Sequence, residues 1–348
     1  MASPNNRPSN GSNKTAFNNI QNSRAEGRRR NEALQKYTFI AVGCMLVLTV
    51  ALLVTMAIGS LVGGEGSSPL GERVDWVSFT VTATDTLHGD LVLVDNDHAY
   101  TFPATDDHLE NIYNVWAAHP QPRPYVLSGL SALMDRDALT ALDKMLADFA
   151  EETGDNNVQL RHAYRTLEEQ EGKEILPGYS DHHTGLGVAL KYEKDGTAYD
   201  LSLEKVYDWL FENCHKYGFV IRYPDGKEDI TGIEDYNYYF RYVGVAHATY
   251  MQKEDLCLEE YLEVLKKYDE KNTLSIRGAD GNKYEVYYVA VDGSATVKYP
   301  TNYAYTVSGT NEGGVVVTID RSTSQKADAD KEDDTSEDTD DGSKDHNY

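Results

Sequence analysis

Two adjacent histidines, His182 and His183, are the residues of this sequence whose types and neighbours best suit catalytic chemistry. They lie in the stretch Ser180–Val188, among small residues and glycines, where an ordinary core segment rarely carries a histidine pair. Neutral imidazole is a common ligand of zinc and of other divalent metals. On composition alone, the stretch fits either a metal site or an exposed loop that leads into a strand.

Segments on both sides of this stretch carry further motifs in a fixed order. They are H-A-Y-R-T-L-E-E-Q (162–170), E-N-C-H-K-Y-G-F-V-I-R-Y-P-D-G-K-E (212–228), T-G (231–232), R-Y-V-G (241–244) and L-C-L-E-E-Y-L (256–262). In this order and at these spacings, roughly residues 90–270 resemble the VanY-type D-alanyl-D-alanine carboxypeptidases of Gram-positive bacteria. The resemblance implies a VanY/hedgehog-like zinc D,D-peptidase fold, and removal of the last D-alanine from peptidoglycan stem peptides.

The same resemblance implies a set of site residues. In such enzymes zinc is bound by the His and the Asp of S-x-H-x-x-G-x-x-x-D and by the His of E-P-W-H, whose Glu is the general base. Three protein ligands leave an open position for water, whose pKa falls to about 7. The Arg of Y-R-S-x-x-x-Q pairs with the substrate's terminal carboxylate, a bidentate task that suits a guanidinium. By this pattern Arg165, Gln170 and Ser180 bind substrate, and His182 is a zinc ligand.

The other metal positions do not match the pattern. The Asp expected seven residues after His182 is Ala189. Between T-G and R-Y-V-G the spacing of eight residues is kept, which places Tyr236 at the Glu position and Tyr239 at the second His position. Two zinc ligands and the general base are therefore replaced. The sequence predicts that the chain holds no zinc and has no catalytic residue.

An active zinc D,D-carboxypeptidase with a rearranged metal site stays as the alternative. Glu234 and Asp235 lie just before the lost Glu position, and a loop shift would bring one of them inward. On a strand, His183 would point to the face opposite its neighbour. An ordinary tyrosine, with a pKa near 10, is a poor zinc ligand. His162 and His247 are predicted to be packing or surface residues.

Both helices and strands are predicted around these motifs. Apolar residues at helical spacing predict helices over 136–153, 202–216 and 254–268. Strands are predicted over 74–82, 158–164, 219–223, 274–276, 284–291 and 315–319. This mixture predicts the α+β class. We expect a carboxypeptidase-like domain over 74–270 and a small β-domain over 271–320.

The N-terminal part of the sequence predicts a membrane anchor. Residues 38–62 are 25 residues without a charge, and a helix of that length spans roughly 37 Å, enough for a bilayer core of ~30 Å. Basic residues precede this segment and acidic residues follow it, which predicts a cytoplasmic N-terminus and an extracellular C-terminal domain. Its length, and the lack of an A-x-A site after it, favour a signal anchor over a cleaved signal peptide.

The remaining segments are predicted to be unstructured. Residues 1–37 form a basic cytoplasmic segment, 63–73 a linker and 321–348 an acidic tail. The whole chain has 57 acidic and 32 basic residues, a net charge of −25. Nucleic acid is excluded as a partner, because phosphate neutralisation needs a basic face. Three cysteines exclude a disulfide-stapled scaffold, and whether Cys214 and Cys257 pair is left open.

Together these features predict a single-pass membrane protein whose extracellular VanY-like domain is catalytically inactive. The expected partner is a peptidoglycan stem peptide ending in D-Ala, held by Arg165 with hydrogen bonds from Ser180 and His182. A spacer or protein-interaction role, with Arg165 and His182 as ordinary core residues, is the alternative that requires no ligand.

Overall fold

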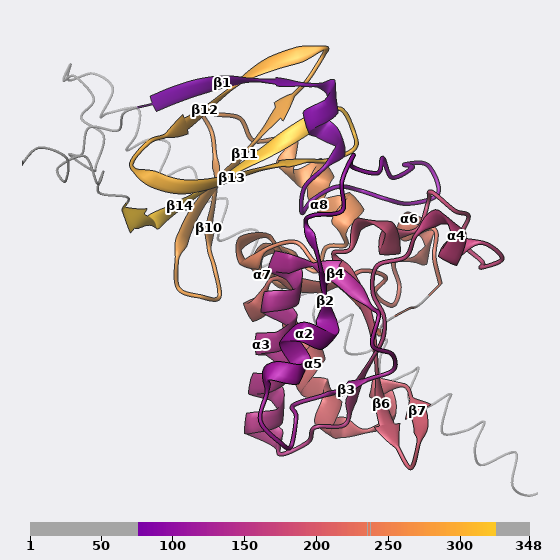
Figure 1. Ribbon diagram of the computed structural model, residues 1–348. Coiled ribbons are helices and arrows are strands. Elements are labelled where there is room, and N and C mark those ends of the chain that lie inside the picture. The colour runs from indigo at the N-terminus through magenta and orange to yellow at the C-terminus, as the bar shows by residue number, and fades with distance from the viewer. Residues whose placement is uncertain (1–75, 235, 237, 325–348) are drawn as a thin grey trace, which may run out of the picture. The chain divides into compact units, whose positions relative to one another are not determined.

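The computed structural model describes residues 76–234, 236 and 238–324 (Figure 1). The predicted basic segment, anchor and linker (1–37, 38–62 and 63–73) lie outside these residues, as does the acidic tail beyond residue 324. Within the described ranges, no helix is both long and apolar enough to cross a membrane. The predicted anchor therefore stays a prediction.

A mixed β-sheet forms the centre of the peptidase-like part. Its strands run in the order β3 (Val126–Leu127), β5 (Val158–His162), β6 (Gly187–Lys194), β9 (Tyr239–Tyr242) and β8 (Phe219–Ile221), with β7 (Thr197–Tyr199) paired to β6. The β3–β5 pair is parallel, and the other pairs are antiparallel. A small second ladder joins β2 (Leu109–Asn111) and β4 (Leu133–Asp135). The predicted mixed class is confirmed.

The long helix α3 (Arg136–Thr153) packs its apolar face into the main core, as its spacing predicts. Its first turn is capped by the Asp135 carboxylate, which accepts the backbone N–H groups of residues 137 and 138. It ends at Gly154, whose φ of 75° is the left-handed conformation that glycine adopts without strain. Leu142 and Phe149 from this helix join Val188 and Phe240 from the sheet in one apolar cluster.

The helix predicted over 202–216 is wrong as a continuous element. Residues 201–217 form short pieces instead: η3 (Leu201–Leu203), η4 (Lys205–Tyr207), α5 (Asp208–Asn213) and η5 (Cys214–Tyr217). Glu204 is extended, with φ −130° and ψ 125°, and this interrupts the hydrogen-bond ladder. The predicted helix over 254–268 is confirmed as α8 (Leu258–Leu265), which is shorter at both ends. The helix α7 (Val245–Glu254) precedes it, and the left-handed Asp255 lies between the two.

Shorter elements complete the peptidase-like part. They are η1 (Ala83–Leu87), α2 (Ile112–Ala118), α4 (Leu167–Gln170), η2 (Asp181–Thr184) and α6 (Glu228–Thr231). The run Leu91–Val94 is buried but is not a strand. Cys214 and Cys257 are both buried free thiols, so they do not pair.

The C-terminal strands form the β-unit. An antiparallel sheet has the order β10 (Leu274–Arg277), β11 (Lys283–Ala290), β14 (Gly314–Ser324) and β13 (Tyr303–Gly309). A second ladder joins β12 (Ser294–Pro300) to β1 (Trp76–Thr82), the first described strand of the chain. Figure 1 shows β1 beside β12, a strand from the opposite end of the described chain. The N-terminal strand thus adds to the β-unit that the sequence predicts over 271–320.

A buried histidine connects the β-unit to the helices beneath it. In His247, on α7, Nδ1 lies 2.7 Å from the hydroxyl of Tyr261 on α8 and Nε2 lies 2.9 Å from Oγ1 of Thr318 on β14. Burial lowers the pKa of His247 to about 4, so its ring is neutral near pH 7. As predicted, this histidine is a packing residue.

Candidate functional site

Arg165 is held in place by a glutamine five residues further along the chain. Its Nη1 donates to Oε1 of Gln170 at 3.2 Å, and the buried Gln170 amide donates to the carbonyl of Ile175 at 2.8 Å. The helix α4 that presents Gln170 begins with a capping box between Thr166 and Glu169. Among the described residues, no carboxylate forms an ion pair with Arg165. The motif residues Arg165 and Gln170 therefore form one unit, with the guanidinium charge uncompensated.

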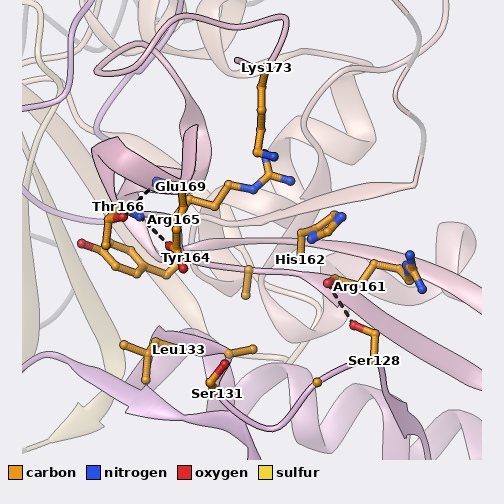
Figure 2. A pocket seen from close by; sticks show the side chains of 13 residues that line it. Ser128, Ser131, Leu133, Arg161, His162, Tyr164, Arg165, Thr166, Glu169 and Lys173 are labelled. Carbon is orange, nitrogen blue, oxygen red and sulfur yellow. Dashed lines mark hydrogen bonds between the residues drawn. The ribbon is translucent and has the colours of Figure 1, made fainter. Parts of the chain in front are cut away.

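A cavity of about 440 Å³ opens beside this guanidinium (Figure 2). The basic side chains among its lining residues are Arg161, Arg165 and Lys173, and the acidic one is Glu169. His162 also lines it, and burial together with the neighbouring arginines lowers the pKa of His162 to about 4. A neutral histidine surrounded by cations indicates a positive potential in this cavity, within a chain whose net charge is −25.

His182 lies in η2, and one of its ring nitrogens forms a hydrogen bond with the backbone. Its Nδ1 is 2.7 Å from the carbonyl oxygen of Ala163, an acceptor, so Nδ1 carries the proton and Nε2 carries the lone pair. Burial and the nearby Arg165 lower the pKa of His182 well below its usual range, so the ring is neutral. A metal-ligating histidine uses the same arrangement, with one nitrogen on a carbonyl and the other free to bind.

The two neighbours of His182 in the motif have different surroundings. Ser180 is buried, and its Oγ has no hydrogen-bond partner in the described part of the chain. His183 is also buried, with Nδ1 2.7 Å from the carbonyl of Arg165 and Nε2 accepting the N–H of Gly178 at 3.0 Å. Both nitrogens of His183 are thus occupied in fixing the backbone around Arg165, and it offers no free lone pair to a metal.

The three positions that the family pattern gives to zinc ligands come together. Ala189 on β6 lies directly opposite Tyr239 on β9. The rings of Tyr239 and His182 have centroids 4.6 Å apart, at an angle of 70°. Tyr236, at the general-base position, is exposed, and its ring centroid is 5.0 Å from that of Tyr238. The three positions therefore lie close together in the fold, and neither Ala189 nor Tyr239 offers a thiolate, imidazole or carboxylate there.

Tyr239 is tied to a buried ionic network. Its hydroxyl donates to Oδ2 of Asp181 at 3.1 Å. Asp181 also pairs with the buried Arg241 and lies 3.6 Å from Nε of Arg222, whose Nη2 is 2.8 Å from Oε1 of Glu259. Burial, with the Asp181 charge next in effect, raises the pKa of Tyr239 well above its usual value. The phenol is therefore protonated, with its proton directed at Asp181.

This donor set does not fit zinc. It offers one imidazole from His182, a methyl group from Ala189 and a protonated phenol from Tyr239, whereas zinc sites use three or four thiolate, imidazole or carboxylate ligands. In the described ranges no cluster of three or more His, Cys, Asp or Glu residues could hold a metal ion. Of the two acids named above as replacement ligands, Glu234 is exposed, and Asp235 lies outside the described residues.

Three residues of the site are missed by sequence reasoning. His162, predicted to be a packing or surface residue, lines the cavity with its ring 6.4 Å from that of His182. Asp181 is the counter-ion of two arginines that follow it by 41 and 60 residues, so only the fold brings them together. At Gly187 a Cβ would overlap the hydroxyl of Tyr239. In the sequence, only the position of Asp181 between the motif residues Ser180 and His182 could have indicated that it belongs to the site.

Comparison with known proteins gives consistent matches. The family model described as VanY, D-alanyl-D-alanine carboxypeptidase, matches residues 172–245. A D-alanyl-D-alanine carboxypeptidase of Enterococcus faecium is 31% identical over 251 residues, which are 69% of this chain and 78% of that protein. The crystal structure of the vancomycin resistance D,D-dipeptidase VanXYg, in complex with a D-Ala-D-Ala phosphinate analogue, is 28% identical. It covers 71% of this chain and 100% of its own, with a TM-score of 0.61.

A third similar structure covers a smaller part of this chain. It is a mutant of a VanY D,D-pentapeptidase from a VanB-type vancomycin resistance cassette, in complex with Zn(II). This protein is 29% identical and covers 50% of this chain and 98% of its own, with a TM-score of 0.38.

Proposed function

Because the chain belongs to the VanY-type D-alanyl-D-alanine carboxypeptidase family, we propose that it binds peptidoglycan stem peptides ending in D-Ala without hydrolysing them. In this proposal it is a membrane-anchored protein, with residues 38–62 as the anchor and the peptidase-like part outside the cell. One observation carries the proposal. Arg165 and Gln170, which the family pattern assigns to carboxylate binding, form one hydrogen-bonded unit beside a cavity, whereas Ala189 and Tyr239 stand where that pattern requires zinc ligands.

The peptide would bind through its terminal carboxylate. Arg165 has four further N–H donors besides the one given to Gln170, which suits a bidentate pair with a carboxylate. Ser180 offers a hydroxyl without a partner in the described residues. Hydrogen bonds to a charged group contribute about 1.5–3 kcal/mol each, so Arg165 is expected to dominate the affinity.

Hydrolysis would lack its two chemical requirements. Amide cleavage by a zinc peptidase needs a polarised water and a carboxylate that takes its proton. The general-base position holds Tyr236, which has no carboxylate to take that proton. The ligand positions do not fit zinc for the reasons given above.

The test is calorimetric binding to the purified chain. The ligand is a short peptide ending in D-Ala-D-Ala, compared with the same peptide carrying a C-terminal amide. We expect Arg165→Ala and the amide each to weaken binding by at least about 10-fold, as loss of a charge-assisted pair implies. The matched control is Arg277→Ala, because Arg277 is an exposed residue of β10 whose Nη1 donates to the carbonyl of Gly281. Equal binding of acid and amide would refute the proposal.

The membrane topology has a separate test. An epitope inserted after residue 348 should be removed from intact cells by added protease, whereas one placed before residue 38 should be protected. Loss of neither epitope would contradict the proposed orientation.

A second candidate function is an active zinc D,D-carboxypeptidase with a rearranged site. The observation in its favour is the contact of His182 Nδ1 with the carbonyl of Ala163, which leaves the lone pair on Nε2, as in many metal-ligating histidines. Release of D-alanine from the same peptide, dependent on added zinc and abolished by His182→Ala, would establish this alternative and overturn the proposal of an inactive homologue.

A further inference from the structure

We propose that the cavity beside Arg165 selects acidic peptides, with Lys173 recognising a second carboxylate upstream of the one bound by Arg165. This inference rests on the proposed function and names the class of ligand within it. It requires that the cavity present more positive charge than one carboxylate compensates, and that this charge be free to act on a ligand.

The two arginines of the cavity are each positioned by a glutamine. Arg165 donates to Gln170 at 3.2 Å, and Nη1 of Arg161 donates to Oε1 of Gln159 at 3.0 Å. An amide oxygen orients a guanidinium but does not neutralise it. In both cases the side chain is fixed and its full charge is retained.

Lys173 adds a third cation with even fewer contacts. It lines the same cavity, and in Figure 2 its side chain extends toward the guanidinium of Arg165. In the part of the chain that the structure describes, its ammonium group has neither a hydrogen bond nor an ion pair. A lysine is a compact, flexible charge, and it can adjust to a carboxylate whose position varies among ligands.

The acidic residue of the cavity lining, Glu169, cancels only part of this charge. Oε2 of Glu169 accepts the backbone N–H of Thr166 at 2.9 Å, which closes the capping box of α4. Three cations and one acid leave a net charge of +2 around a space of about 440 Å³. A single ligand carboxylate would leave one positive charge uncompensated.

This positive excess occurs in a chain of opposite net charge. Acidic residues outnumber basic ones by 57 to 32, so a cation has many carboxylates available as partners. Lys144, Lys191 and Lys227, for example, each lie 2.7–2.8 Å from a carboxylate oxygen. Unpaired cations collected at one cavity therefore point to an anionic ligand that supplies the missing partners.

The experiment compares two D-Ala-D-Ala peptides that differ at a single upstream glutamate, present either as the free acid or as its amide. The wild-type chain should bind the acid about 5-fold more tightly than the amide, as expected for a partly exposed ion pair. Lys173→Gln should reduce this ratio to about one, and Lys173→Glu should reverse it. Lys271→Gln, an exposed lysine in the segment between α8 and β10, is the matched control and should keep the wild-type ratio.

The outcomes separate the two proposals. If both peptides bind equally to the wild type through Arg165, or if Lys173→Gln keeps the preference, the inference is wrong and the proposed function stands. If neither peptide binds, the proposed function fails with it. Retained binding of the amide peptide by Lys173→Gln shows that this variant is folded.

Discussion

Ala189 on β6 is the direct antiparallel partner of Tyr239 on β9. Side chains of such a pair lie on the same face of a sheet, with Cβ atoms about 4.5–5.5 Å apart. The ring centroids of His182 and Tyr239 are 4.6 Å apart. The three positions therefore share one small space, and what separates this site from a metal centre is the chemistry of two side chains rather than their placement.

Restoring the donor atoms should restore the metal. The wild-type chain should retain close to no zinc after dialysis, whereas the triple variant Ala189→Asp, Tyr236→Glu, Tyr239→His should retain about one equivalent, because three ligands and a base then converge. Elemental analysis measures both. Adding His182→Ala to the triple variant should remove the metal again. One equivalent in the wild type, lost in His182→Ala, would instead establish a rearranged site.

Gly187→Ala should destabilise the fold because its methyl group would overlap the hydroxyl and ring of Tyr239. Overpacking of this kind costs about 1–3 kcal/mol, measurable by urea unfolding. In the background Tyr239→Ala the same substitution should cost much less, which a double-mutant cycle reports as coupling. Gly129→Ala is the control, since a Cβ there meets no atom within 4 Å. Additive effects at positions 187 and 239 would show that the two do not touch.

Asp181→Asn should be far more damaging than Tyr239→Phe. The first substitution removes the charge that faces the buried Arg241 and Arg222, and breaking a buried ion pair costs about 3–5 kcal/mol. The second removes one hydrogen bond to Asp181 and should cost about 1 kcal/mol. Free energies of unfolding from urea titrations compare them. Similar losses for both would mean that the arginines do not depend on Asp181.

Acid should loosen the contact between the β-unit and the helices through His247. Its pKa is about 4 in the folded chain and ~6.5 in an unfolded one, so the unfolded state binds more protons between these values. The contribution to stability is complete above about pH 6.5 and declines as the pH falls to about 4, by on the order of 3 kcal/mol. His247→Gln should flatten this part of the stability–pH curve. An unchanged slope in that variant would assign the acid sensitivity to other groups.

Apolar spacing and capping residues in the sequence correctly predict a helix that is stabilised by contacts between nearby residues. The helix α3 has regular apolar spacing, an Asp cap and a terminal glycine, and each of these acts within a few residues. The segment 201–217 has similar spacing, yet it is broken at Glu204. There Tyr207 and Trp209 both pack against Phe149 of α3, with ring centroids 5.7 Å away in each case. That contact depends on the fold, and spacing alone does not reveal it.

In the candidate site, too, some residues are predictable from the sequence and others are not. The resemblance of motifs leads to Arg165 and Gln170, which the structure joins by a hydrogen bond. It also leads to the replaced positions at 189 and 239, which the structure brings together. The charge of the cavity was not predictable, because Arg161 and Lys173 lie outside the motif positions and the fold alone makes them share a space with Arg165.

The pairing of β1 with β12 has a mechanical consequence. Residues 76–82 are bound to residues 294–300 by seven registered pairs, so a pull from the N-terminal side enters the fold through the β-unit. The β1–β12 ladder bears that load before it reaches the cavity around Arg165. A force applied at residue 76 would act first on the hydrogen bonds between β1 and β12.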